Sequence, residues 1–231
     1  MRRKRTVIAA VATVALAGGA FLAIRLLDQT ILAKRAVAEA VKAGNRQDWQ
    51  TAEENYTAAI RKLPESADFQ DRALLAHAYS GRAIVREKMQ RYTDAPEDIS
   101  RSVQVEPESS YHLFLRGSIR LKVGQFDDAA VDFEEVFQRN DANSTAAYYR
   151  GLVAERQGDL PKAAEYFRKA IGTRIVPESA GRSDAKFHAA LSRVLEKTGD
   201  TAGALAAANT ARSLDQEVSF AFPDLGKLPL G

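Results

Sequence analysis

Two segments of this chain carry the same residues at the same places. Residues 116–133 read RGSIRLKVGQFDDAAVDF, and residues 150–167 read RGLVAERQGDLPKAAEYF. The arginine–glycine pair, the next glycine, the alanine and the last phenylalanine of the first segment each recur 34 positions later. A period of 34 residues is typical of solenoids built from pairs of helices. The two segments therefore predict a repeated helix–turn–helix unit.

Each unit is expected to hold two closely packed helices. Gly117 and Gly151 fall within the first helix, where glycine costs about 1 kcal/mol relative to alanine. We expect close approach of the second helix to offset this cost. Gly124 and Gly158 should end the first helix in a left-handed conformation, which glycine adopts without strain. The alanine of each unit and the phenylalanine four residues later share one helix face, which we expect to be buried.

This pattern of glycine, alanine and phenylalanine resembles the tetratricopeptide repeat. The leading tryptophan and leucine of that family are absent, and Arg120 and Ala154 stand where it has a tyrosine. The resemblance implies an all-α fold, a right-handed superhelical solenoid. It also implies that the first helices of successive units line a concave surface that binds proteins.

The same repeat pattern extends over about five units, because pairs of small residues 12 positions apart recur along residues 33–216. Five units are enough to bury a continuous core. Insertions near residues 65–73 and 173–184 interrupt the period, and we expect both to form loops. The positions expected to pack the repeats are Ala40, Ala52, Tyr56, Ala83, Ala95, Gly117, Ala129, Phe133, Gly151, Ala163, Phe167, Ala204 and Ala208.

The N-terminal region has the features of a membrane anchor. Residues 2–5 read RRKR, and residues 6–24 form an uncharged run of 19 residues. A helix of this length can cross a bilayer core of about 30 Å, and the preceding positive charges favour a cytoplasmic N-terminus. We therefore predict a single-pass protein of the inner membrane with an extracytoplasmic or periplasmic repeat domain. A cleaved signal peptide is the alternative, because residues 15–17 read ALA, a small-residue cleavage site.

The C-terminal tail differs in composition from the repeats, because it is apolar and contains Pro223 and Pro229. Proline argues against a helix there. The tail could cover the end of the last repeat, lie in the groove or offer a peptide to a partner, or be disordered. The predicted organisation is a basic cytoplasmic N-terminus (1–5), a transmembrane anchor (6–24), a stalk (25–32), the repeat domain (33–216) and the tail (217–231).

The first helices supply candidate groove residues of two kinds. A basic residue recurs at one position, which predicts a positive surface for an acidic segment of a partner. The alternative is that these charges are solvated helix ends diluted by neighbouring glutamates. Aromatic residues at the centre of the groove would anchor a partner, unless they belong to the core between repeats. The candidates are Lys88, Tyr111, Phe114, Ser118, Lys122, Tyr148, Leu152, Arg156 and Lys197.

Three further basic residues also recur at the repeat period. Arg82, Arg116 and Arg150 are 34 positions apart. Each comes directly before the small residue in the first helix of its unit, which is alanine in one unit and glycine in the other two. Their side-chain stems should therefore be partly buried. We expect these arginines to be structural and to pair with carboxylates of a neighbouring second helix.

Composition and motifs argue against catalysis. The net charge of +3 is too small to favour nucleic acid as a partner, and the absence of cysteine excludes disulfides. The three histidines lie in separate units without metal-ligand spacing, and no nucleotide-binding or nucleophile motif occurs. We therefore expect no catalytic residue, no cofactor, no metal and no enzymatic activity.

The predicted function is a protein–protein interaction scaffold, tethered to the membrane, that assembles or stabilises a complex of the cell envelope. The partner is expected to be a protein with an acidic or extended segment. Two alternatives are a soluble periplasmic chaperone-like protein, released by signal cleavage, and an accessory regulatory subunit of a membrane enzyme. The sequence leaves the partner's identity and the oligomeric state open.

Overall fold

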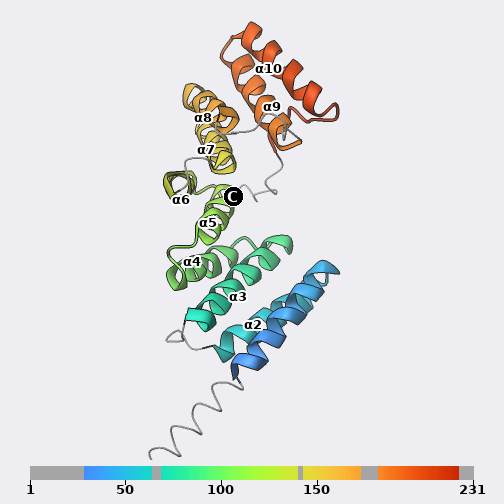
Figure 1. Ribbon diagram of the computed structural model, residues 1–231, viewed down its shortest axis with the longest axis vertical. Coiled ribbons are helices and arrows are strands. Elements are labelled where there is room, and N and C mark those ends of the chain that lie inside the picture. Colours follow the sequence, from blue (N-terminus) through green and yellow to red (C-terminus); the bar gives the residue numbers. More distant parts are fainter. Residues whose placement is uncertain (1–28, 64–68, 140–142, 173–181, 224–231) are drawn as a thin grey trace, which may run out of the picture.

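The computed structural model describes residues 29–63, 69–139, 143–172 and 182–223, and every regular element in these ranges is a helix (Figure 1). The first helix covers residues 29–45. The others are α2 (Trp49–Lys62), α3 (Phe69–Lys88), α4 (Ala95–Val105), α5 (Ser110–Lys122), α6 (Phe126–Arg139), α7 (Ser144–Arg156), α8 (Leu160–Gly172), α9 (Arg182–Lys197) and α10 (Thr201–Leu214).

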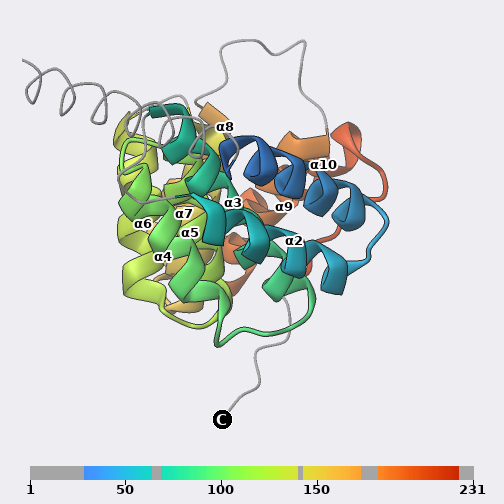
Figure 2. The same ribbon diagram turned by 90° about the horizontal axis from the view of Figure 1, so that it is seen from below.

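The helices form consecutive pairs, as the 34-residue period predicts. The helix of residues 29–45 shares a core with α2 and α3, and from α2 to α10 each helix packs against the next in the chain. Successive pairs follow one another along the long axis of the molecule (Figure 1). Viewed along that axis, the pairs are turned relative to one another (Figure 2). The fold is therefore an all-α solenoid of helix–turn–helix units.

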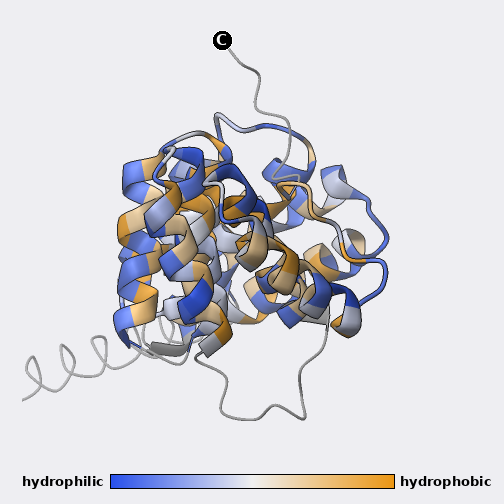
Figure 3. Cartoon of the chain, turned by 90° about the horizontal axis from the view of Figure 1, so that it is seen from above, coloured by the Kyte–Doolittle hydropathy of each residue, from blue (hydrophilic) through white to orange (hydrophobic). Residues whose placement is uncertain are grey.

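The core lies between the helices of each unit and between neighbouring units. Hydrophobic and hydrophilic residues lie on different sides of many of the helices (Figure 3), so one side can be buried while the other stays in solvent. Helix α7 differs, because residues on almost every side of it are buried. Phe133 and Phe167 are completely buried, and the predicted packing positions are all in the interior. These side chains are small or aromatic, which allows the helix pairs to approach closely.

The glycines of the first helices make room for aromatic rings. A Cβ atom at Gly117 would lie 2.9 Å from Cε1 of Phe133, and one at Gly151 would overlap the ring of Phe167. In both units the ring comes from the second helix of the same pair. Close approach of the second helix therefore offsets the cost of a mid-helix glycine. The side chain that lies against the glycine is the phenylalanine four residues after the predicted alanine.

The turn inside each unit requires a left-handed residue. Gly124, Gly158 and Gly199 have φ angles of 80°, 81° and 83°, whereas Gln47 and Gln90 occupy the corresponding place in the first two units with φ of 60°. Such a conformation costs a non-glycine residue about 1–2 kcal/mol. Two units of the solenoid therefore contain a locally strained turn that the other three avoid.

We expect Gln90→Gly to raise the free energy of unfolding by about 0.5–1 kcal/mol, because relief of strain exceeds the added freedom of the unfolded chain. Gln90 is exposed, so no packing is lost. Denaturation by guanidinium chloride would measure the change. The reverse exchange, Gly158→Ala, serves as the control, because nothing lies within 4 Å of a Cβ there and only strain is added. Gln90→Gly without a gain would contradict this account of the turn.

The first insertion differs from the predicted loop. Helix α3 begins at Phe69, so residues 69–73 are helical. No glycine or proline interrupts this stretch, and Thr30 donates a 2.7 Å hydrogen bond to Asp71 that ties the extension to the preceding unit. Of the second predicted insertion, residues 173–181 lie outside the described residues.

The structure corrects the predicted location in the inner membrane. No helix within the described ranges is both long enough and apolar enough to cross a bilayer. The longest helix with defined ends, α3, has 20 residues and carries charged side chains along its length. The uncharged run of residues 6–24, on which the prediction depended, lies outside the described residues. The single-pass location with an extracytoplasmic repeat domain is therefore withdrawn.

Candidate functional site

The first helices of neighbouring units form one surface. Helix α5 contacts both α3 and α7 directly, and two ion pairs also join first helices of neighbouring units. Lys122 of α5 bonds to Glu87 of α3, and Lys197 of α9 lies 2.8 Å from Glu155 of α7. Since first helices approach one another in this way, they occupy the inner side of the curved solenoid. We call the surface formed by α3, α5, α7 and α9 the inner surface.

The four predicted basic residues do not act alike on this surface. Lys122 and Lys197 are paired with glutamates, as described above. Arg156 is exposed, and its guanidinium lies over the ring of Phe222 at 4.0 Å from the ring centre. Lys88 is exposed at the end of α3. The inner surface therefore does not present a continuous row of free positive charge.

Two of the predicted apolar candidates belong to the core. Leu152 is completely buried, and Tyr148 is 8% exposed. The Tyr148 ring packs against Phe167 and Phe187, with ring centres 5.7 and 5.0 Å away. Burial raises the pKa of Tyr148 to about 12, so its hydroxyl stays protonated at neutral pH. Both residues join neighbouring repeats.

The candidates on α5 include the most accessible aromatic residue of the predicted groove. Phe114 is half-buried and packs edge-on against Phe133 and Tyr149. Ser118 donates its hydroxyl hydrogen bond to the main-chain oxygen of Phe114. Tyr111, in contrast, is 53% exposed. Tyr111 is thus free to contact a partner, whereas the other two mainly support the helix pair.

The recurring arginines pair with second-helix carboxylates, as predicted. Arg82 bonds to Asp98 through Nε at 2.8 Å and Nη2 at 2.6 Å. Arg116 makes the equivalent contact with Asp132 at 3.1 and 2.6 Å. A second arginine one helical turn later also binds each aspartate, Arg86 in one unit and Arg120 in the next. These clusters join the two helices of a unit and are structural.

The next unit departs from this arrangement. Tyr166 stands where Asp132 stands one period earlier, and the Arg150 guanidinium lies over its ring at 4.8 Å. Arg150 instead donates a hydrogen bond to Glu134 of the preceding second helix. The same arginine position therefore joins different helices in different units.

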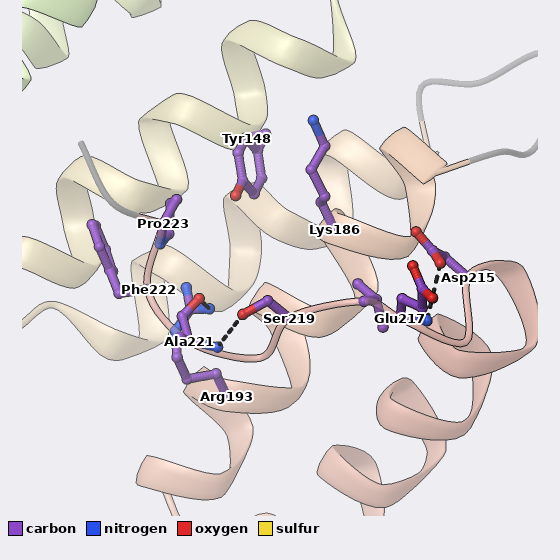
Figure 4. Close-up of a pocket in the computed structure, with 10 residues that line it drawn as sticks. Tyr148, Lys186, Arg193, Asp215, Glu217, Ser219, Ala221, Phe222 and Pro223 are labelled. Atoms are coloured by element: carbon purple, nitrogen blue, oxygen red, sulfur yellow. Dashed lines mark hydrogen bonds between the residues drawn. The ribbon is translucent and has the colours of Figure 1, made fainter. Parts of the chain in front are cut away.

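The described part of the C-terminal tail lies on the inner surface. After α10, residues 215–223 pass across α9 towards α7 (Figure 4). Nη1 of Arg193 donates hydrogen bonds to the main-chain oxygens of Phe220, at 3.2 Å, and Ala221, at 3.1 Å. The Phe222 ring packs on the core beside α7, below the guanidiniums of Arg156 and Arg193. Phe220 lies under Arg212 of α10, so these residues combine two of the predicted alternatives: they cover the last repeat and they reach into the groove.

A buried carboxylate holds Arg193 in position. The side chain of Glu155 is 2% exposed, and both its oxygens accept hydrogen bonds from Arg193, at 2.8 and 2.6 Å. Burial alone would raise the pKa of Glu155, but the hydrogen bonds from Arg193 and Lys197 outweigh it and lower this pKa. Glu155 therefore remains ionised and orients the guanidinium towards the tail.

A cavity of about 570 Å³ separates part of the tail from α7 and α9 (Figure 4). Tyr148, Lys186 and Arg193 form its helical wall, and residues of the tail form the opposite wall. Residues 215–223 are thus bound at a few points and are not packed along their whole length. This geometry can hold an extended chain through main-chain hydrogen bonds and one aromatic side chain.

Arg193 makes most of these contacts, although the repeat pattern does not mark it as a groove residue. The available signal was its place one helical turn before Lys197, which puts the two side chains on the same face of α9. A lone arginine has many structural roles, however, and only the approach of the tail distinguishes this one.

Comparisons with known proteins agree with the helix-pair architecture. Residues 114–180 match the family model described as tetratricopeptide repeat. A search of curated proteins finds no match. The matched residues are the stretch in which the 34-residue period is clearest.

Several solved structures are similar to this chain. MamA residues 41–end from Desulfovibrio magneticus RS-1 has 19% identity and a TM-score of 0.67, with 81% of this chain and 97% of that chain covered. BtubC from P. vanneervenii has 19% identity and a TM-score of 0.67, with coverage of 83% and 91%. YrrB, described as a TPR protein with an unusual peptide-binding site, has 15% identity and a TM-score of 0.60, with coverage of 80% and 87%. At these identities the similarity establishes a shared fold.

Proposed function

We propose that this protein is a non-enzymatic scaffold that assembles protein complexes by holding an extended segment of a partner against its inner surface. The observation that carries the proposal is the contact of Arg193 with two successive main-chain carbonyl oxygens of an extended segment, Phe220 and Ala221. Main-chain recognition of this kind suits a peptide from any source. The description of the structurally similar YrrB as having a peptide-binding site supports a binding role.

The charges of the inner surface do not select an acidic partner, so we expect the partner to be recognised by its extended main chain. Glu87 neutralises Lys122, and Glu155 neutralises Lys197. An acidic segment would have to displace these glutamates, and the buried one would then lose its partners. Lys88 and Arg156 remain as separate exposed charges, which is too few for strong selection of acidic residues.

The part of the inner surface on α5 offers an anchor for a partner. Tyr111 is half exposed beside a hollow of about 280 Å³. An exposed tyrosine provides a large apolar contact area at a low cost in conformational entropy, and such residues dominate the energetics of interfaces. The other residues that line the hollow are Ser110, Phe114, Val136, Asn143 and Thr145.

Site-specific photo-crosslinking would test the proposal. We expect a benzoylphenylalanine at Tyr111 to crosslink a discrete partner protein in cells of the source organism, identified by mass spectrometry. The matched control is the same residue at Val131, which is 64% exposed but lies on the second helix α6. Crosslinks of equal yield from both positions, or from Val131 alone, would contradict binding at the inner surface.

A further inference from the structure

We infer that residues 219–223, here called the tail segment, are an internal ligand that competes with the partner for the inner surface. The inference rests on the proposed function and specifies the partner's chemistry. The partner is an extended protein segment whose aromatic side chain replaces Phe222 between Arg156 and Arg193. Binding of the partner therefore requires release of the tail segment.

The contacts of the tail segment select aromatic side chains. Arg156 and Arg193 lie over the Phe222 ring, 4.0 and 5.4 Å from its centre, and Arg212 lies over the Phe220 ring at 4.9 Å. A guanidinium is attracted to the face of an aromatic ring by the ring quadrupole, and an aliphatic side chain lacks that attraction. Because three arginines lie over two rings, this site should bind aromatic side chains more tightly than other apolar side chains.

The remaining contacts do not depend on the tail's own sequence. Arg193 binds main-chain oxygens, which every peptide carries. Its orientation is set by Glu155, a residue of α7 that does not belong to the tail. When the tail segment leaves, the arginine remains held by Glu155 and faces the same space. The site is therefore preformed for another extended segment.

Release of the tail segment does not require the solenoid to unfold. Ser219 and Ala221 are exposed, and Phe220 and Phe222 are only partly buried. By contrast, the phenylalanines that join the helix pairs, such as Phe167, are completely buried. The tail segment thus covers the repeat surface without completing the core of a helix pair.

The short connection to α10 makes the tail segment an effective competitor. Helix α10 ends at Leu214, so only residues 215–218 separate the two. A short tether gives an intramolecular ligand an effective concentration in the millimolar range. A free peptide of the same sequence cannot compete at micromolar concentration. A partner displaces the tail segment only by adding contacts elsewhere on the inner surface, for example at Tyr111.

The test uses a fluorescent peptide of residues 217–225, EVSFAFPDL, and the full-length chain. We expect fluorescence anisotropy to show at least 10-fold tighter binding to the F220A/F222A variant than to the wild type, because the variant's own tail no longer competes. Adding Arg156→Ala to this variant should weaken peptide binding. Adding Lys88→Ala is the matched control and should leave it unchanged, since Lys88 holds the same repeat position away from the tail.

A milder substitution keeps the test valid if the double variant folds poorly. Phe222→Leu retains apolar packing and removes the aromatic face, and it should also increase binding of the peptide. Equal affinity for the wild type and both variants, with a normal circular dichroism spectrum, would overturn the inference. Failure of the peptide to bind any variant would overturn it as well, while crosslinking from Tyr111 would still test the proposed function separately.

Light scattering after gel filtration distinguishes an internal ligand from exchange of tails between copies. We expect the wild type and F220A/F222A to have the same mass. A wild-type dimer that the double substitution converts to monomers would show that the tail segment binds a second copy, and this result would overturn the internal contact.

Discussion

Replacing Asp132 by alanine should lower the free energy of unfolding by about 3–5 kcal/mol, the usual cost of removing one partner from a buried ion pair. The carboxylate is completely buried between α5 and α6. Nη2 of Arg116 lies 2.6 Å from it and Nη1 of Arg120 lies 2.7 Å away. Both arginines are mostly buried, so alanine would leave two positive charges without compensation inside one helix pair.

Thermal and guanidinium denaturation of the purified chain would measure this loss. Asp128→Ala is the matched control, because Asp128 lies on the same helix and is exposed. It should change stability by less than about 0.5 kcal/mol, as surface substitutions usually do. Equal losses for the two variants would show that the Arg116–Asp132 cluster does not stabilise the unit. Asp98→Ala should reproduce the large effect one period earlier.

Gly151→Ala should destabilise the protein by about 2 kcal/mol, although alanine is the better helix former by about 1 kcal/mol. The added Cβ would overlap the Phe167 ring, and that ring is completely buried. Neither helix α7 nor the ring can move away without disturbing the adjacent core. Overpacking of this kind typically costs about 1–3 kcal/mol, which outweighs the gain in propensity.

A second glycine, on the following helix, separates the effect of helix propensity from the effect of overlap with the ring. Gly172 is the last residue of α8, and nothing lies within 4 Å of a Cβ placed there. Gly172→Ala should therefore be neutral or stabilise by up to about 0.5 kcal/mol. Adding Phe167→Leu to Gly151→Ala should recover part of the loss, because the smaller side chain frees space. A stable Gly151→Ala variant would contradict the close approach of α7 and α8.

The two halves of the inner surface have different roles in the proposed mechanism. The part on α7 and α9 is covered by the tail segment through Arg156 and Arg193. The part on α5 presents Tyr111 to solvent. A partner that first contacts Tyr111 could then displace the tail segment, whereas a short peptide that reaches only the covered part could not. The scaffold would in this way select long extended partners.

The repeated unit can be predicted from local residue spacing alone. The spacing of Gly117, Ala129 and Phe133, and its recurrence 34 residues later, predicted paired helices, their turns and their buried faces. This information is local: helical periodicity decides which residues share a face, and only glycine fits a left-handed turn without strain. The structural role of Arg82 and Arg116 followed for the same reason, because their aspartate partners lie within the same unit.

Contacts between units set which charges and aromatic residues are available to a partner. Lys122 is neutralised by a glutamate 35 residues away, and Lys197 by one 42 residues away. Tyr148 is buried while Tyr111 is exposed, although both were predicted to face the groove. These outcomes depend on the rotation of each unit against the next and on the path of the tail across α9 and α7. A repeat pattern does not encode either quantity, because both are set by contacts between units.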